Sequence, residues 1–111
     1  MSDFVTKTGA KLHYEMIGNS DLTPLVLIHG QSMCGKDYEK ITGKLSEKYA
    51  VYLVDCFGHG ESEKNPALYR CSIIGDSISE LIESEIARPC LLSGHSSGGI
   101  LAAYIAGKML R

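Results

Sequence analysis

Residues 90–109 read CLLSGHSSGGILAAYIAGKM, a short apolar run followed by a glycine-rich turn and a second apolar series. The run Cys90–Leu92 does not alternate with polar residues, which is typical of a β-strand covered on both faces. After the turn, apolar residues recur at the spacing of an α-helix: Ile100, Leu101, Tyr104, Ile105 and Met109. This stretch therefore predicts a buried strand that leads through a tight turn into a helix.

The rest of the chain repeats this strand and helix alternation. Leu25–Ile28 and Val51–Val54 are apolar runs that predict two more buried strands. Apolar or aromatic residues at helical spacing predict a helix over Tyr38–Tyr49 and a longer helix over Ile73–Ile86. Such alternation predicts an α/β fold in which the strands are parallel and the helices cross over between them.

The N-terminal residues have a different pattern. Asp3–Lys7 and Lys11–Ile17 flank the turn Thr8–Ala10, which contains a glycine, so they predict an antiparallel hairpin. A length of 111 residues and the absence of repeats or a linker-like stretch indicate a single domain over residues 1–111. We therefore expect one sheet that begins with this hairpin and continues with three parallel strands.

The turn between strand and helix contains a G-x-S-x-G motif, formed by Gly94, His95, Ser96, Ser97 and Gly98. In a nucleophile elbow of this kind, the serine lies on a strained turn and the glycines allow strand and helix to approach closely. A second interpretation is a glycine-rich turn in which the serine only caps the helix. The elbow interpretation predicts an unusual backbone conformation at Ser96.

Two further motifs follow the other predicted buried strands. His29 and Gly30 come directly after the first strand, and residues 55–62 read DCFGHGES after the second. Together with the G-x-S-x-G turn, these motifs resemble those of the α/β-hydrolase family. The resemblance implies the strand order 1-2-4-3-5, which places the strands ending at Ile28 and Ser93 side by side. Ligands bind where the helices change face in such a sheet.

The resemblance also implies roles for individual residues. Ser96 would attack a carbonyl carbon, and the backbone N–H groups of Ser97 and Gln31 would form the oxyanion hole. The implied supporting residues are His29, Gly30, Gly94, His95, Gly98 and Asp55. The expected activity is hydrolysis of an ester or related acyl compound of a small molecule, with no cofactor and no metal.

The histidines and carboxylates of this chain do not complete a catalytic triad. In the family the serine is followed along the chain by the acid and then the histidine. Residues 97–111 contain no Asp, Glu or His. We expect structural roles for His29 and His59, packing beside the strand for His95 and a surface position for His13, and no triad role for Asp55, Asp76 or Glu80.

The missing triad residues suggest that the chain is the N-terminal part of a single α/β-hydrolase domain without its C-terminal strands. The strand ending at Ser93 would then lie at an edge of the sheet. We expect self-association, or a partner chain that completes the sheet, and little turnover by the chain alone. A non-catalytic truncated remnant or a binding module is the alternative function.

A nucleotide-binding alternative rests on residues 30–36, which match the first seven positions of a P-loop. The eighth position would be Ser or Thr to hold magnesium, but it is Asp37. This interpretation also leaves the turn around Ser96 without a purpose. The hydrolase interpretation uses all three motifs.

Composition excludes several classes of partner. A net charge of −2 without a basic stripe indicates no nucleic acid. No stretch approaches the roughly 18 apolar residues of a membrane span, and the N-terminus lacks a secretory pattern, so we expect a cytoplasmic protein that does not bind membranes. The four cysteines have no metal-binding spacing and are expected to be free thiols: Cys34, Cys56, Cys71 and Cys90.

Overall fold

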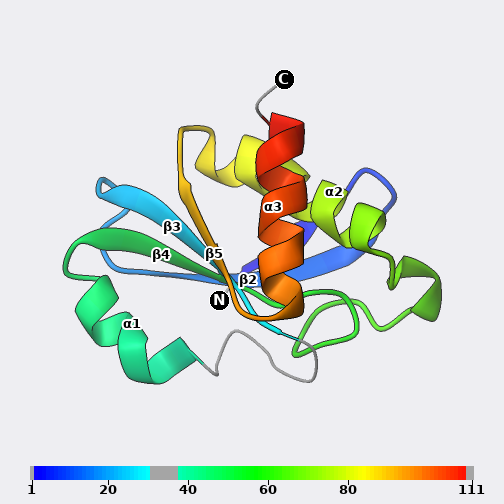
Figure 1. Cartoon of the computed structure of the whole chain (residues 1–111), viewed down its shortest axis with the longest axis horizontal. Helices are drawn as coiled ribbons and strands as arrows, with labels where there is room; N and C mark the ends of the chain where they lie inside the picture. The colour runs from blue at the N-terminus through cyan, green and yellow to red at the C-terminus, as the bar shows by residue number, and fades with distance from the viewer. Residues whose placement is uncertain (1, 31–37, 110–111) are drawn as a thin grey trace.

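The computed structural model describes residues 2–30 and 38–109, with the side chains of residues 39 and 40 excepted. Within these residues the strands are β1 (Ser2–Val5), β2 (Lys11–Ile17), β3 (Thr23–Ile28), β4 (Tyr49–Val54) and β5 (Leu91–Gly94). They form one sheet in the order β1-β2-β4-β3-β5 (Figure 1). The predicted antiparallel hairpin, the three parallel strands and the strand order are all confirmed.

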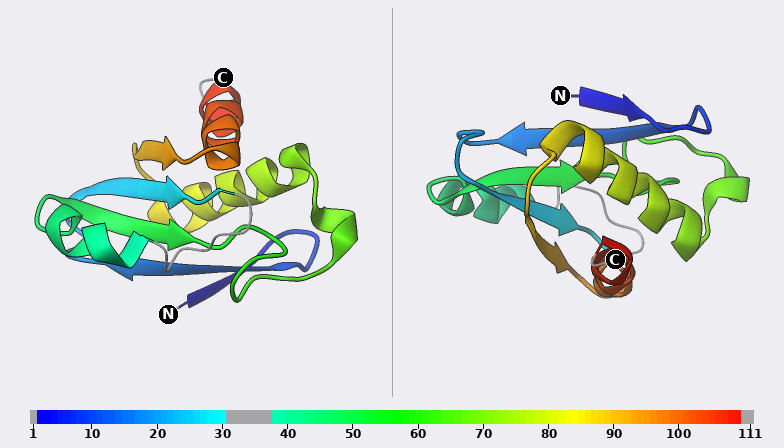
Figure 2. Two further views of the ribbon diagram at one scale, coloured as in Figure 1. Left: turned by 60° about the horizontal axis from the view of Figure 1, so that its bottom comes forward. Right: turned by 90° about the horizontal axis from the view of Figure 1, so that it is seen from above.

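Helices cover the two faces of this sheet unequally (Figure 2). The helices α2 (Cys71–Leu81) and α3 (Ser97–Met109) pack on one face, together with the π-helical turn η3 (Ile82–Ile86). The short helix α1 (Glu39–Leu45) lies on the other face. Most of the core is therefore between the sheet and the α2/α3 pair.

Side-chain alternation along the central strands explains how both faces are filled. Val26 and Ile28 of β3 point into the larger cluster, whereas Leu25 and Leu27 point into the smaller one. Successive side chains of a strand lie on opposite faces, so an apolar run without alternation supplies both clusters. The interpretation of β3 and β4 as strands covered on both faces is confirmed.

The same interpretation is wrong for β5. Leu91 is 48% exposed and Ser93 is exposed, so within the described residues only the α2/α3 face of this strand is covered. Strand β5 lies at the edge of the sheet and pairs with β3. Self-association through this strand stays a prediction.

Helix boundaries differ from the sequence expectation in two places. The helix predicted over Tyr38–Tyr49 ends at Leu45, because the N–H groups of Glu47 and Lys48 bond the carbonyls three residues back and tighten the chain into a turn. Tyr49 then pairs with Thr23 as the first residue of β4. The predicted long helix over Ile73–Ile86 is present as α2, which begins at Cys71, and its π-helical continuation η3.

The turn η3 ends the second crossover in an unusual way. The Ala87 N–H bonds the Ile82 carbonyl five residues back, and Ala87 itself is left-handed with φ 55°. Arg88 then fastens this corner to the loop before β3, because its guanidinium donates to the carbonyls of Ser20, Asp21 and Leu22. These contacts fix where β5 begins.

The remaining short helix, η2 (Pro66–Leu68), precedes α2. Asn65 caps it, since the Asn65 side chain accepts a hydrogen bond from the Ala67 N–H. The cysteines in the described part of the chain are free, as expected: Cys56, Cys71 and Cys90. No helix in the described part of the chain is long and apolar enough to cross a membrane.

Candidate active site

The turn between β5 and α3 has the conformation predicted for a nucleophile elbow. Ser96 has φ 56°, in the left-handed region of backbone conformation that residues other than glycine rarely adopt. The Gly98 N–H bonds the His95 carbonyl at 2.9 Å, and the Gly99 N–H bonds the Ser96 carbonyl at 2.9 Å. The turn thus holds an exposed serine directly before the first residue of α3.

The two glycines of the motif are required by close backbone contacts. A Cβ atom on Gly94 would lie 2.1 Å from the Gly98 carbonyl oxygen. A Cβ atom on Gly98 would lie 2.3 Å from the Ile28 carbonyl oxygen at the end of β3. Both distances are far shorter than any real carbon contact, so strand, helix and neighbouring strand meet at this point only because neither residue has a side chain.

The carbonyl of Ile28 connects β3 to the elbow. It accepts a hydrogen bond from the His95 N–H at 3.1 Å and another from the Tyr38 hydroxyl at 3.0 Å. Burial, and then the nearby Cys56, raises the pKa of Tyr38, so the phenol stays protonated and donates. The predicted adjacency of the strands ending at Ile28 and Ser93 is confirmed, whereas nothing in the sequence pattern indicated the contact of Tyr38.

The segment His29–Gly30 lies buried beside the elbow. The His29 Nδ1 atom is 2.7 Å from the Gly30 carbonyl oxygen, and Nε2 accepts a hydrogen bond from the Cys56 N–H at 2.9 Å. Both ring nitrogens are therefore bonded to the backbone, and His29 joins the loop after β3 to the loop after β4. This geometry agrees with a structural role and leaves neither nitrogen to act as a base.

The expected oxyanion hole falls partly outside the described residues. Gln31 lies between the two described ranges, so its position is not part of the structure. Ser97 is the first residue of α3, where helix N–H groups have no partner within the helix and the dipole favours negative charge. The described half of the expected hole is thus a helix N-terminus placed next to Ser96.

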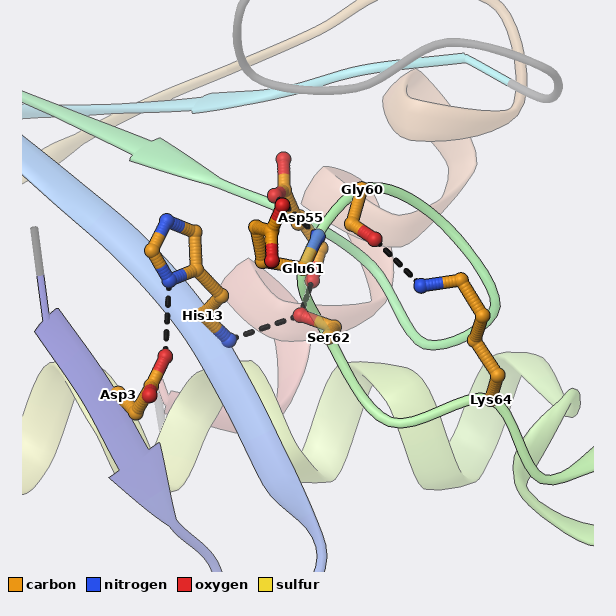
Figure 3. Close-up of polar contacts among 7 residues, drawn as sticks. All are labelled: Asp3, His13, Asp55, Gly60, Glu61, Ser62 and Lys64. Carbon is orange, nitrogen blue, oxygen red and sulfur yellow. Dashed lines mark hydrogen bonds and ion pairs between the residues drawn. The ribbon is translucent and has the colours of Figure 1, made fainter.

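The loop after β4 is organised around the buried carboxylate of Asp55 (Figure 3). The Asp55 Oδ2 atom accepts a hydrogen bond from the Glu61 N–H at 3.0 Å, and Gly60 packs directly on this carboxylate. The Ser62 hydroxyl donates to the Asp55 carbonyl and accepts from the His13 N–H at 2.8 Å. Asp55 therefore orders the loop, in line with the supporting position expected for it.

Two expectations for histidines are wrong. His13 is buried rather than on the surface, because β1 covers it and its Nδ1 atom lies 2.8 Å from the Asp3 carboxylate (Figure 3). The His95 side chain is exposed rather than packed beside the strand, since the turn directs only its N–H toward β3. His59 is placed as expected in the loop after β4, with Nδ1 3.1 Å from the Phe57 carbonyl oxygen.

The carboxylates of Asp76 and Glu80, for which the sequence predicts no triad role, hold helices in place. The Asp76 carboxylate accepts from the Tyr104 hydroxyl at 2.8 Å and from the Lys108 ammonium at 2.7 Å, which ties α2 to α3. These hydrogen bonds, that from Lys108 first, lower the pKa of Asp76. Glu80 accepts from the Lys7 N–H at 2.9 Å. Both carboxylates thus have structural partners.

The thiol of Cys56 is a buried nucleophilic group in the loop after β4, where the Cys56 N–H bonds His29. Burial, followed by the neighbouring Asp55, raises the pKa of Cys56 to about 12. Only the thiolate is a good nucleophile, so this thiol is inert near neutral pH. In residues 2–30 and 38–109, no group of three or more His, Cys, Asp or Glu side chains is placed to hold a metal ion.

Comparisons with known proteins agree with this fold. The model of the alpha/beta hydrolase family matches residues 25–110, and the chain belongs to this family. Membership in this family argues against the P-loop interpretation of residues 30–36. Of these residues, only Gly30 lies in the described part of the chain.

Particular relatives are named as hydrolases. The chain is 31% identical over 84 residues to a pimeloyl-[acyl-carrier protein] methyl ester esterase of Chromobacterium violaceum, covering 76% of this chain and 31% of that protein. It is 31% identical over 104 residues to an sn-1-specific diacylglycerol lipase of Danio rerio, covering 91% of this chain and 32% of that protein. The chain thus spans about a third of the length of these relatives.

A solved structure extends the comparison to three dimensions. The chain superposes on a hydrolase from Pseudomonas aeruginosa with a TM-score of 0.89 at 27% identity, covering 95% of this chain and 40% of that chain. The sheet and its helices are therefore those of an α/β hydrolase over the shared part.

Proposed function

We propose that Ser96 is the nucleophile of a hydrolase that cleaves an ester or related acyl compound of a small molecule. The observation that carries the proposal is the exposed serine in a left-handed turn between β5 and the N-terminus of α3. Relatives named as an esterase and a lipase support an ester as the substrate. The serine at the elbow, in place of an aspartate, favours attack by a hydroxyl.

In the proposed reaction the Ser96 Oγ atom attacks the carbonyl carbon of the ester. The electron pair of the C=O bond moves to oxygen, and the N–H groups of Ser97 and Gln31 stabilise this oxyanion. Collapse of the intermediate expels the alcohol and leaves an acyl group on Ser96, which water then removes. Loss of one oxyanion donor typically costs about 3 kcal/mol of transition-state stabilisation.

A general base must take the proton of Ser96 and pass it to the departing alkoxide. His29 has both ring nitrogens bonded to the backbone, and His13 is held against Asp3. In the family order the acid and the histidine follow the serine, and residues 97–111 contain neither. The proposal therefore places the acid and the base outside residues 1–111.

The test is acylation of the purified 111-residue chain by p-nitrophenyl acetate, followed by mass spectrometry. We expect slow transfer of one acetyl group to Ser96, with little turnover. In complete triads, removal of a member leaves roughly 10³-fold catalysis over water, so a residual reaction is measurable.

Ser96→Ala and Ser72→Ala are the matched variants, because Ser72 is an exposed serine of α2. The first variant should lose the adduct and the second should keep it. Acetyl groups on other residues with Ser96 unmodified would overturn the nucleophile and favour a binding module. Rapid Ser96-dependent turnover would instead overturn the placement of the base outside residues 1–111.

A further inference from the structure

The carbonyl oxygen of Ile28, at the end of β3, contacts three groups from other parts of the chain. It accepts the His95 N–H at 3.1 Å and the Tyr38 hydroxyl at 3.0 Å. It also lies so close to Gly98 that a Cβ atom there would be 2.3 Å away. A carbonyl oxygen has two lone pairs, so the two hydrogen bonds satisfy it. Residues on both sides of Ser96 in the chain therefore contact one oxygen atom.

Tyr38 reaches this oxygen from the α1 face of the sheet. Its side chain is partly buried against the smaller core cluster, which includes Leu25 and Leu27 of β3. Helix α3, which has the elbow at its N-terminus, packs on the opposite face. The hydroxyl of Tyr38 therefore joins the α1 face to the end of the strand that supports the elbow.

The orientation of the Ile28 carbonyl affects the elbow directly. The pairing of β3 with β4 and with β5 ends at this residue, so the next peptide group has no further strand pairing to hold it. Loss of one hydrogen bond leaves a buried acceptor half satisfied, and the carbonyl tilts toward its remaining donor. Such a tilt moves the His95 N–H and the backbone at Gly98, and with them the Ser96 hydroxyl and the Ser97 N–H.

We propose that Tyr38 is a positioning residue for the reaction of Ser96, because its hydroxyl fixes the Ile28 carbonyl against which the elbow is built. The inference rests on the proposed function, since it takes Ser96 as the nucleophile and the Ser97 N–H as an oxyanion donor. A displacement of reacting groups by about 1 Å lowers a rate by up to about 100-fold. The smaller displacement expected without this hydroxyl should lower it by about fivefold to tenfold.

The first test is Tyr38→Phe, which removes the hydroxyl and keeps the ring that packs against the smaller cluster. Acylation of Ser96 by p-nitrophenyl acetate is measured over a range of ester concentrations. We expect the maximal rate of acylation to fall about fivefold to tenfold. The ester concentration that gives half of this rate should stay unchanged, because the hydroxyl bonds a backbone carbonyl rather than the ester.

Tyr14→Phe is the matched control, because it removes a hydroxyl that donates a hydrogen bond of the same length. The Tyr14 hydroxyl donates to the Glu85 carboxylate at 3.0 Å. Tyr14 lies in β2, which β4 and β3 separate from β5. Urea titrations measure the stability of both variants, and only Tyr38→Phe should lose acylation. Equal rates in the two variants would mean that acylation follows general stability, and would overturn the positioning role of Tyr38.

An NMR experiment separates this inference from the proposed function. The amide resonances of His95 and Ser97 are compared in the unsubstituted chain and in the two variants, without ester. We expect both resonances to shift in Tyr38→Phe and neither to shift in Tyr14→Phe. Such shifts, with no acylation of the unsubstituted chain, would overturn the nucleophile and keep the support of the elbow by Tyr38. Unchanged resonances or unchanged acylation in Tyr38→Phe would overturn the positioning role and keep the nucleophile.

Discussion

Two glycine-rich loops leave the same edge of the sheet, and they use similar backbone conformations in opposite ways. After β4, Gly60 with φ 52° packs on the buried carboxylate of Asp55, and Ser62 is buried between two backbone groups. After β5, Ser96 with φ 56° is exposed and its neighbours Gly94 and Gly98 make the close contacts. The first loop is stabilised by buried polar side chains. The second is stabilised by close contacts between backbone atoms, and its serine hydroxyl stays exposed.

One added methyl group at Gly98 and at Gly60 should reveal the largest difference between the two loops. In Gly98→Ala the new carbon meets the Ile28 backbone, which cannot move without displacing β3. We expect a loss of at least about 3 kcal/mol in the free energy of unfolding, measured with urea. In Gly60→Ala the carbon meets a side-chain carboxylate that can shift, so the loss should be closer to about 2 kcal/mol.

Gly107→Ala is the control for this pair, because it adds the same methyl group to α3 where nothing lies within 4 Å. It should stabilise the chain by up to about 1 kcal/mol through helix propensity. Equal losses in Gly98→Ala and Gly60→Ala would remove the distinction between backbone and side-chain contacts.

Ser62→Ala tests whether the buried hydrogen bonds of the loop after β4 stabilise the fold. This change leaves the buried His13 N–H without its acceptor and removes a donor to the Asp55 carbonyl. We expect a loss of about 1–3 kcal/mol in the free energy of unfolding. Ser72→Ala, at an exposed position, should change stability by less than about 0.5 kcal/mol, and a similar value for Ser62→Ala would show that the loop does not depend on this hydroxyl.

The strain in the second loop is tested by Ser96→Gly alongside Ala87→Gly. Both residues are left-handed, with φ 56° and 55°, but only Ser96 lies at the elbow. Glycine relieves the strain and partly offsets this gain through the greater entropy of the unfolded chain, so each variant should gain about 0.5–1 kcal/mol. Acylation by p-nitrophenyl acetate should disappear in Ser96→Gly alone, and its loss in Ala87→Gly would mean that the whole α2 to β5 corner supports the site.

The smallest effect concerns the support of the first loop by the β1–β2 hairpin. The hydrogen bond from His13 lowers the pKa of Asp3 below 3.8, with a smaller contribution from Lys11. A depressed carboxylate pKa stabilises the fold above the unfolded value and ceases to do so as the pH falls through the folded value. The stability difference between the chain and Asp3→Asn should therefore be present at pH 5–6, begin to shrink near pH 3.8 and vanish only below the lowered pKa of Asp3 in the folded chain.

Urea titrations across this range measure that difference, and the double variant with His13→Gln serves as the control. Once His13 is replaced, Asp3→Asn should have no further effect. A difference that does not shrink at all as the pH falls well below 3.8, or that survives in the His13→Gln background, would contradict the pairing of these two side chains.

The sequence pattern predicted the elbow because its requirements are local. Gly94 and Gly98 lie two residues on either side of Ser96, within one turn between a strand and a helix. The strand order followed from the family resemblance rather than from periodicity. Tyr49 was misplaced because an aromatic residue at helical spacing fits a strand equally well, and only its pairing with Thr23 decides between them.

Roles that depend on long-range contacts could not be predicted from the sequence. The Tyr38 hydroxyl bonds a backbone carbonyl, and any residue has one, so no sequence pattern marks the partner. The burial of His13 depends on Asp3 in one strand and Ser62 in a distant loop. The Tyr69 ring packs against Gly58, which has φ +85°, and the motif shows this position only as a glycine.

The contacts of the Ile28 carbonyl make the turn at Ser96 depend on a distant part of the chain. It bonds the His95 N–H and abuts Gly98, so the left-handed turn at Ser96 has its support only after β3 has paired with β5. Contacts between segments so distant in the chain carry a loop-closure cost that the rest of the fold must offset. An unfolded or newly synthesised chain therefore presents Ser96 as an ordinary, relaxed serine, and the proposed reactivity arises only once β3 and β5 have paired.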